Sequence, residues 1–167
     1  MAQILGQPFG LVKNGYLTIS SATTWSSVTG VVNASCSGTV DTTSLSATGS
    51  FVAGQVIIIH HSRGTTGNTG GWELNQVRSY VAGTITTLLP LANTYTDSGA
   101  DQSQVQTLPE FASVTVNSGI TLSSASWDGN VGGIIAFLCS GTTDIQGTIS
   151  STTSGFRGGA NPNVANS

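Results

Sequence analysis

Hydrophobic positions along this chain come in short β-branched runs, and nowhere do they recur at helical spacing over the length of a helix. The most apolar run, Val56 to Ile59, predicts a strand over residues 55–60 that is buried on both faces. Residues 72–81, 84–89 and 104–108 alternate between apolar and polar positions, as strands do. Because Gly, Ser, Asn or Pro bounds these runs, the pattern predicts an all-β fold.

A weak internal repeat lies in the last third of the chain. Residues 116–122 align with residues 145–150, each a pair of short β segments around a corner that carries a glycine. Stacked in parallel, with residues 134–138 between them, two such turns would begin a β-solenoid in which each coil buries its apolar face against the next. We therefore expect a short β-solenoid or β-sandwich-like domain, with chance similarity in a Ser/Thr/Gly-rich chain as the alternative.

The 167 residues are enough for one ordinary domain. Residues 1–30 are punctuated by glycines and a proline, which favours an extended N-terminal arm or oligomerisation segment that contacts a neighbouring subunit. We expect residues 31–160 to form the all-β domain and residues 161–167 to form a C-terminal tail.

Charge is scarce in this chain: 7% of its residues are charged, against about 25% in an average soluble domain. The four fixed cations are scattered, so no cluster exists to neutralise successive phosphates, and we expect no nucleic-acid partner. No basic face is available for an anionic membrane, and no apolar run approaches the roughly 20 residues that span a bilayer. We therefore expect no membrane partner either.

An ordered succession of short motifs covers residues 38–160. The motifs are Gly54–Ile59, Gly64–Thr65, Trp72–Val77, Leu89–Tyr95, Val114–Val116, Trp127–Gly129, Gly132–Ile135, Gly147–Ile149 and Gly155–Gly159. This succession resembles the amino-terminal region of Gly-rich right-handed β-helix proteins of bacterial surfaces and of phage tails and virions. Its order is more specific than any single motif, and it implies the fold more strongly than the function. Gln55 stands where the pattern has Asp, and relatives usually continue into a long solenoid, which favours a compact decoration or connector protein here.

The most suggestive local cluster for chemistry is His60, His61 and Arg63, at the end of a predicted strand. Two imidazoles and a guanidinium are groups that bind a metal or steer an anion. Adjacent strand residues point to opposite faces, however, so the histidines cannot chelate one ion without a bulge. The acidic turn at residues 97–101 lacks the ligand succession of recognised calcium loops. We expect no metal and no cofactor.

Catalysis by a glycosidase or lyase would require two carboxylates, or one with a base, converging in a cleft. Asp128 and Asp144 fall in predicted corners, where Asp commonly bonds its own backbone, and Glu73 falls within a strand. We therefore expect no catalytic residue and no enzymatic activity. The seven acidic residues are Asp41, Glu73, Asp97, Asp101, Glu110, Asp128 and Asp144.

Aromatic residues are the best candidates for contacts with a partner chain or a sugar. Trp25 is the first candidate for an intersubunit contact, whereas a packing role is favoured for Trp127 beside its Asp-Gly corner. Cys36 and Cys139 either close one long loop or stay as buried thiols, and their strand-like surroundings favour thiols. The expected partner or glycan contacts are Trp25, Trp72, His60, His61, Arg63 and Trp127.

Three hypotheses for the function follow. The leading one is a structural phage virion protein, such as a capsid decoration, head-fibre base or tail component, that assembles as a homo-oligomer with other virion proteins. The start of the chain lacks the basic and apolar segments of a signal peptide, which fits a virion protein released by lysis. The alternative is a secreted or cell-surface adhesin that binds polysaccharide through residues 62–71 and nearby aromatics. The third is a carbohydrate-cleaving β-helix enzyme.

Overall fold

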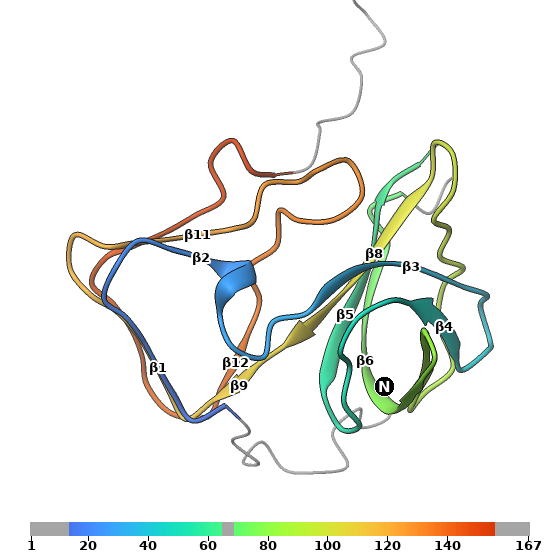
Figure 1. Cartoon of the computed structure of the whole chain (residues 1–167), viewed down its shortest axis with the longest axis horizontal. Helices are drawn as coiled ribbons and strands as arrows, with labels where there is room; N and C mark the ends of the chain where they lie inside the picture. The colour runs from blue at the N-terminus through green and yellow to red at the C-terminus, as the bar shows by residue number, and fades with distance from the viewer. Residues whose placement is uncertain (1–13, 65–68, 156–167) are drawn as a thin grey trace, which may run out of the picture.

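The middle of the chain forms a closed antiparallel barrel whose six strands follow the order β3-β4-β7-β6-β5-β8 (Figure 1). The computed structural model describes residues 14–64 and 69–155. The predicted strands over residues 55–60, 72–81, 84–89 and 104–108 correspond to β5 to β8. The barrel strands are β3 (Asn33–Gly38), β4 (Ser44–Ala47), β5 (Val56–Arg63), β6 (Trp72–Val81), β7 (Thr84–Thr87) and β8 (Gln102–Leu108).

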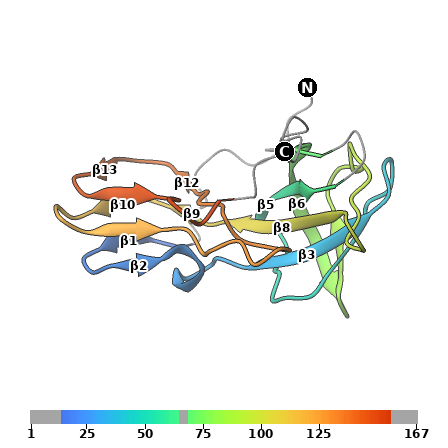
Figure 2. The ribbon, with the colours of Figure 1, turned by 90° about the horizontal axis from the view of Figure 1, so that it is seen from above.

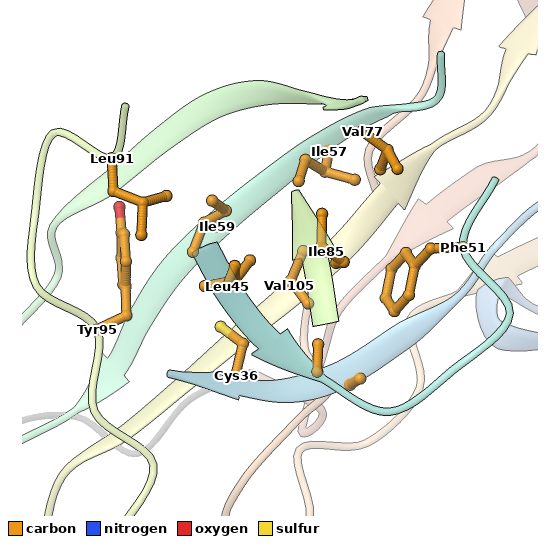
Figure 3. Packing of buried hydrophobic residues seen from close by; sticks show 12 residues of the cluster. Cys36, Leu45, Phe51, Ile57, Ile59, Val77, Ile85, Leu91, Tyr95 and Val105 are labelled. Atoms are coloured by element: carbon orange, nitrogen blue, oxygen red, sulfur yellow. The ribbon is translucent and has the colours of Figure 1, made fainter. Parts of the chain in front are cut away.

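The barrel interior is filled by alternate residues of its strands, as period-2 patterning requires. Ile57 and Ile59 on β5 point inward together with Leu45, Ile85 and Val105, and these five side chains are fully buried (Figure 3). They form the first of two separate hydrophobic cores.

The second core belongs to a stack of parallel β-coils beside the barrel, shown as superposed outlines in Figure 1 and as layers in Figure 2. Within the described residues it has three coils, and it confirms both the predicted solenoid and the predicted repeat. Val116 pairs with Ile145, and Leu122 with Ile149. Its elements are β1 (Tyr16–Ile19), β2 (Thr23–Thr24), the 3-10 turn η1 (Trp25–Ser27), β9 (Glu110–Phe111), β10 (Ser113–Val116), β11 (Thr121–Ser123), β12 (Leu138–Cys139), β13 (Thr143–Ile145) and β14 (Thr148–Ser150).

The arm expected over residues 1–30 is corrected where the structure describes it. β1 pairs in parallel with β10, and β2 pairs with β11, so these residues form the first coil instead of an extended arm. The alternation of Leu17 and Ile19 with polar neighbours was the available signal for a strand. The expected domain over residues 31–160 contains the barrel and the other two coils, while residues 1–13 and 156–167 lie outside the described residues.

The barrel is inserted between the first and second coils, and β8 leads through Pro109 directly into β9 of the solenoid. The Gln104 amide locks the two bodies together: its Nε2 donates to the Gly132 carbonyl at 3.1 Å, and its Oε1 accepts from the Gly132 N–H at 2.9 Å. Thr107 Oγ1 donates to the Gly30 carbonyl at 2.6 Å and accepts from the Val32 N–H at 2.8 Å. We call Gln104 and Thr107, with these backbone partners, the joint.

The two cysteines are free thiols in different cores, as the sequence favoured. Cys36 is buried in the barrel, and Cys139 packs against the solenoid core. Burial raises the pKa of the Cys36 thiol, which keeps it protonated at neutral pH.

Among residues 14–64 and 69–155, no helix is long and apolar enough to cross a membrane.

Candidate functional site

His60 and Trp72 lie side by side on the outer face of the barrel. They are register partners on β5 and β6, and the Trp72 side chain is 60% exposed. Burial, followed by the neighbouring His61, lowers the pKa of His60. The exposed indole is therefore a flat apolar surface beside an imidazole that is neutral at pH 7.

His61 points the other way, into the rim of the barrel, and is only 2% exposed. It continues the interior row of Ile57 and Ile59 on β5, as the alternation of strand residues predicts. The sequence-based expectation that His60 and His61 face opposite sides is confirmed. His61 is among the expected partner or glycan contacts, but its burial leaves almost none of its surface exposed to a partner.

Arg63 and Trp127, which are far apart in the sequence, meet where the barrel approaches the solenoid. The guanidinium carbon lies 5.9 Å from the centroid of the indole ring. Arg63 Nε donates to the Ala100 carbonyl at 3.1 Å, and its Nη2 donates to the Gly99 carbonyl at 3.2 Å. The guanidinium thus holds the turn at residues 98–101 against the loop that carries Trp127.

Trp25 is buried in the solenoid core, with 1% of its surface exposed. Its ring packs against Phe137 at a centroid distance of 5.8 Å. The expected intersubunit contact through this indole is therefore wrong. In a chain with few large apolar residues, the indole fills the interior of the coil stack.

Asp128 supports its own turn, as expected for an Asp-Gly corner. Its Oδ1 accepts from the N–H groups of Asn130 at 2.8 Å and Val131 at 2.9 Å, and bonds to these two groups lower the pKa of the carboxyl. A cleft of about 290 Å³ lies beside this turn, between the solenoid and the start of β3. The cleft is lined by Ser26, Val31, Asn33, Ser126, Asp128 and Val131, among others.

A second hollow, of about 450 Å³, lies on the barrel surface and is lined almost entirely by residues that carry hydroxyl groups. Ser37 on β3 and Ser44 and Ser46 on β4 contribute to it, together with residues 94–96. It contains neither a carboxylate nor an imidazole, so its walls offer hydrogen bonds and no acid–base chemistry.

The motif residues Glu73 and Asn75 have structural roles at one end of the barrel. Glu73 Oε2 accepts from the Ala92 N–H at 2.6 Å, and burial raises the pKa of this carboxyl. Asn75 Nδ2 donates to the Leu89 carbonyl at 3.0 Å, and its Oδ1 accepts from the Leu89 N–H at 3.2 Å. The sequence alone does not indicate these contacts, and the structure shows that the two side chains hold residues 89–92 over the barrel.

The third coil has an open edge, which we define as β12, β13 and β14 with the side chains of Ile145 and Ile149. Ile145 is 39% exposed and Ile149 40%, whereas Val116 and Leu122, their register partners on the second coil, are fully buried. Within the described residues, β13 and β14 have no strand on their outer side. At the opposite edge of the stack, Ile19 is buried. The sequence indicates the repeat, but it does not indicate which coil has its apolar side chains exposed.

Over residues 14–64 and 69–155, no group of three or more His, Cys, Asp or Glu side chains is placed to hold a metal ion.

The chain's sequence matches no known protein family and no curated protein. Among solved structures it is similar to the Gp54 tailspike of Acinetobacter baumannii bacteriophage AP22, in complex with A. baumannii capsular saccharide, at a TM-score of 0.38 and 9% identity. It is also similar to the gp61 tailspike of Pseudomonas phage phi297, at a TM-score of 0.38 and 14% identity. Both matches cover 81% of this chain, but only 27% and 24% of the respective tailspike chains.

Proposed function

We propose that this chain is a non-catalytic structural component of a phage particle that associates with a second copy of itself through the open edge of its third coil. The observation that carries the proposal is the exposure of Ile145 and Ile149 at positions that are fully buried one coil earlier. Burying such side chains against a further layer of β-structure is how a coil stack gains stability. The proteins that the sequence resembles include phage tail and virion proteins, which is the reason for proposing a phage particle.

The open edge lacks the features that prevent strands from pairing. Edge strands are usually guarded by lysines, prolines or bulges, yet residues 138–155 contain no Lys, Arg or Pro and a single acidic residue, Asp144. A second copy therefore meets little charge repulsion at this edge.

A second copy is favoured because the two edges of the stack differ. Ile19, at the first-coil edge, is already buried, so stacking the open edge of one chain onto the first coil of the next would cover partly exposed isoleucines on one side only. Two open edges that face each other across a two-fold axis would bring each isoleucine pair against its counterpart. Such an interface closes as a dimer and does not propagate as a filament.

The structural roles of several carboxylates support a non-catalytic function. Asp128 bonds its own turn, Glu73 holds the Ala92 N–H, and Asp144 Oδ2 accepts from the Gln146 amide at 2.8 Å. These three groups stabilise three different loops or strands instead of converging in one cleft.

Association through the open edge is tested by replacing Ile149 with lysine. We expect the wild-type chain to sediment as a dimer at micromolar concentration, and Ile149→Lys to weaken dimerisation by on the order of tenfold or more, because a buried unpaired ammonium is costly. The measurement is sedimentation velocity over a concentration series. Val81→Lys is the matched control, since Val81 is an exposed apolar residue on the barrel.

A wild-type chain that stays monomeric at high concentration contradicts this assembly, as does an Ile149→Lys chain that dimerises like the wild type. The assignment to a phage particle has its own readout, quantitative mass spectrometry of purified particles. Absence of the chain from such particles would contradict that assignment and leave the dimer unaffected.

Polysaccharide binding is a second candidate function, favoured by the exposed Trp72 beside His60. An exposed indole stacks on the apolar face of a sugar ring, and large exposed aromatics commonly mark binding surfaces. On a glycan array, we expect any signal given by the wild type to be lost in Trp72→Ala. Tyr16→Ala should keep the signal, because Tyr16 is an exposed aromatic on the solenoid, away from this surface. Equal binding by both variants would exclude Trp72.

A further inference from the structure

We infer that the cleft between the solenoid and the start of β3 binds an uncharged ligand with neighbouring hydroxyl groups, of the size of one pyranose sugar ring. The inference starts from buried amide atoms without hydrogen-bond partners on the barrel wall beside this cleft. It does not depend on the proposed dimer, because none of the residues that line the cleft belongs to the open edge.

Two amide side chains face this region from adjacent strands. Asn33 on β3 and Gln106 on β8 are register partners, so their side chains lie on the same face of the barrel wall. That face is the outer one, because the next pair, Ala34 and Val105, belongs to the barrel core. Asn33 Oδ1 and Gln106 Nε2 are buried, and neither makes a hydrogen bond to any described residue. The pair therefore presents an acceptor and a donor side by side.

Gln104 shows how an amide on this face is satisfied when the protein supplies the partners. It precedes Gln106 by two residues on β8 and therefore shares its face. Both of its amide atoms bond to Gly132, which lines the cleft. Gln106 is only 2% exposed, yet its Nε2 receives no such partner. Buried polar groups are almost always hydrogen-bonded, so this pair of amides indicates an external ligand.

The wall formed by residues 125–133 is held in place without a ligand. The Gly133 N–H donates to the Ala125 carbonyl at 2.8 Å, and Asp128 ties residues 128–131 into a turn. Gly132 has a φ of 114°, and a Cβ on it would lie 2.5 Å from the Ser126 carbonyl oxygen, so this close approach requires glycine. A preformed cleft loses little entropy when a small ligand binds.

The charge of the lining selects an uncharged ligand. Asp128 is the one charged side chain among the lining residues, and bonds from the Val131 and Asn130 N–H groups lower the pKa of its carboxyl. The carboxylate is therefore ionised at neutral pH and repels anions. A single carboxylate is too few ligands for Ca²⁺ or Mg²⁺.

Neighbouring hydroxyl groups match the polar atoms. A hydroxyl can donate one hydrogen bond and accept two, so one hydroxyl can donate to Asn33 Oδ1 while the next accepts from Gln106 Nε2. Asp128 has lone pairs left to accept from a further hydroxyl. The ligand must carry several hydroxyls close together, as a sugar does.

The size and the remaining walls suit one sugar ring. The volume of about 290 Å³ lies just below the roughly 300–1,000 Å³ of pockets for drug-sized ligands. Val31, Val131 and Ala125 provide apolar walls for the C–H face of a ring. Ser26 provides a hydroxyl from η1, which lies where the solenoid meets β3 (Figure 1).

The cleft is distinct from the surface around Trp72. Both lie on the outer face of the barrel, where β6, β5, β8 and β3 are neighbours in that order. Trp72 and Asn33 are therefore three strand spacings apart, about 14 Å. One sugar ring cannot contact both, so the two candidate surfaces can be tested separately.

The test is an NMR titration of the isotope-labelled full chain with the methyl glycosides of glucose, galactose and mannose, and with glycerol. We expect at least one glycoside to bind with a dissociation constant on the order of a millimolar and to shift the side-chain NH₂ signals of Asn33 and Gln106. Glycerol, which has neighbouring hydroxyls but no ring, should bind at least tenfold more weakly.

Two variants remove the site in different ways. Gln106→Met keeps the volume of the side chain but removes the donor, so it should weaken binding at least tenfold. It should not reduce stability, because Gln106 Nε2 has no partner in the chain. Ser26→Phe fills the cleft from an exposed position and should abolish binding.

Matched controls make the same changes elsewhere. Gln146→Met alters an exposed amide, and Thr29→Phe adds a ring at an exposed position that does not line the cleft. Both should bind like the wild type. Trp72→Ala should also keep the NH₂ shifts, whatever its effect on a glycan array.

Several outcomes would overturn the site. They are no shift with any glycoside at about a hundred times the expected constant, equal binding of glycerol, and unchanged binding in a folded Gln106→Met chain. Clear destabilisation by Gln106→Met would show that the protein itself satisfies this amide. Circular dichroism checks that each variant is folded, and if one is not, the NH₂ shifts of the wild type still decide.

Discussion

Replacing Gln104 with alanine is expected to lower the free energy of unfolding by about 2–4 kcal/mol. The substitution removes both hydrogen bonds to Gly132 and leaves a buried N–H and a buried carbonyl without partners. The loss falls at the joint, so we also expect the single urea transition to broaden or divide as the barrel and the solenoid begin to unfold separately. Urea denaturation followed by both far-UV circular dichroism and tryptophan fluorescence measures the two effects.

Gln146→Ala is the matched control for the joint. This amide makes one exposed hydrogen bond, to Asp144, so its loss should change stability by about 0.5 kcal/mol or less. A cost below about 1 kcal/mol for Gln104→Ala, with superimposable transitions from the two probes, would show that the joint contributes little to holding the bodies together.

Truncation of Leu122 is expected to cost about 2–5 kcal/mol, whereas the same change at Ile149 in the monomer should cost about 1 kcal/mol or less. The two residues are register partners on adjacent coils, but Leu122 is fully buried and Ile149 is partly exposed. Each variant therefore serves as the control for the other. Thermal and urea unfolding at a concentration where the chain is monomeric measures both.

At dimer-forming concentrations the comparison should change, because Ile149 is then covered by a second copy. We expect the cost of Ile149→Ala to rise with protein concentration and that of Leu122→Ala to stay nearly constant. Equal costs for the two substitutions in the monomer would mean that the third coil is already covered, and the proposed dimer would lose its main support.

The barrel strands were predictable because their information is local. Period-2 alternation over residues 72–81 and the apolar run at 56–59 fix which segments are strands, and the opposite orientations of His60 and His61 follow from the same alternation. Which strands pair is a non-local property. The sequence contains no local signal that Tyr16 lies opposite Ser113, so the first coil was assigned to an arm.

The candidate site residues also differ in whether the sequence alone could identify them. Trp72 was identified from its residue type alone, and its exposure agrees with a surface role. The contact between Arg63 and Trp127 depends on tertiary structure, because the two residues are far apart in the sequence. Trp25 was misplaced because residue type does not distinguish an indole that anchors a partner from one that fills a core.

The insertion of the barrel between two coils sets an order for folding. β1 and β2 leave the ribosome long before β10 and β11, so the first coil cannot form its strand pairs until the second coil has been synthesised. Closing a flexible loop of about a hundred residues costs about 4 kcal/mol of chain entropy. Once the barrel has formed, the pairing of Asn33 with Gln106 has already brought the flanking segments together. The barrel therefore acts as an internal template that lowers the nucleation barrier of the solenoid.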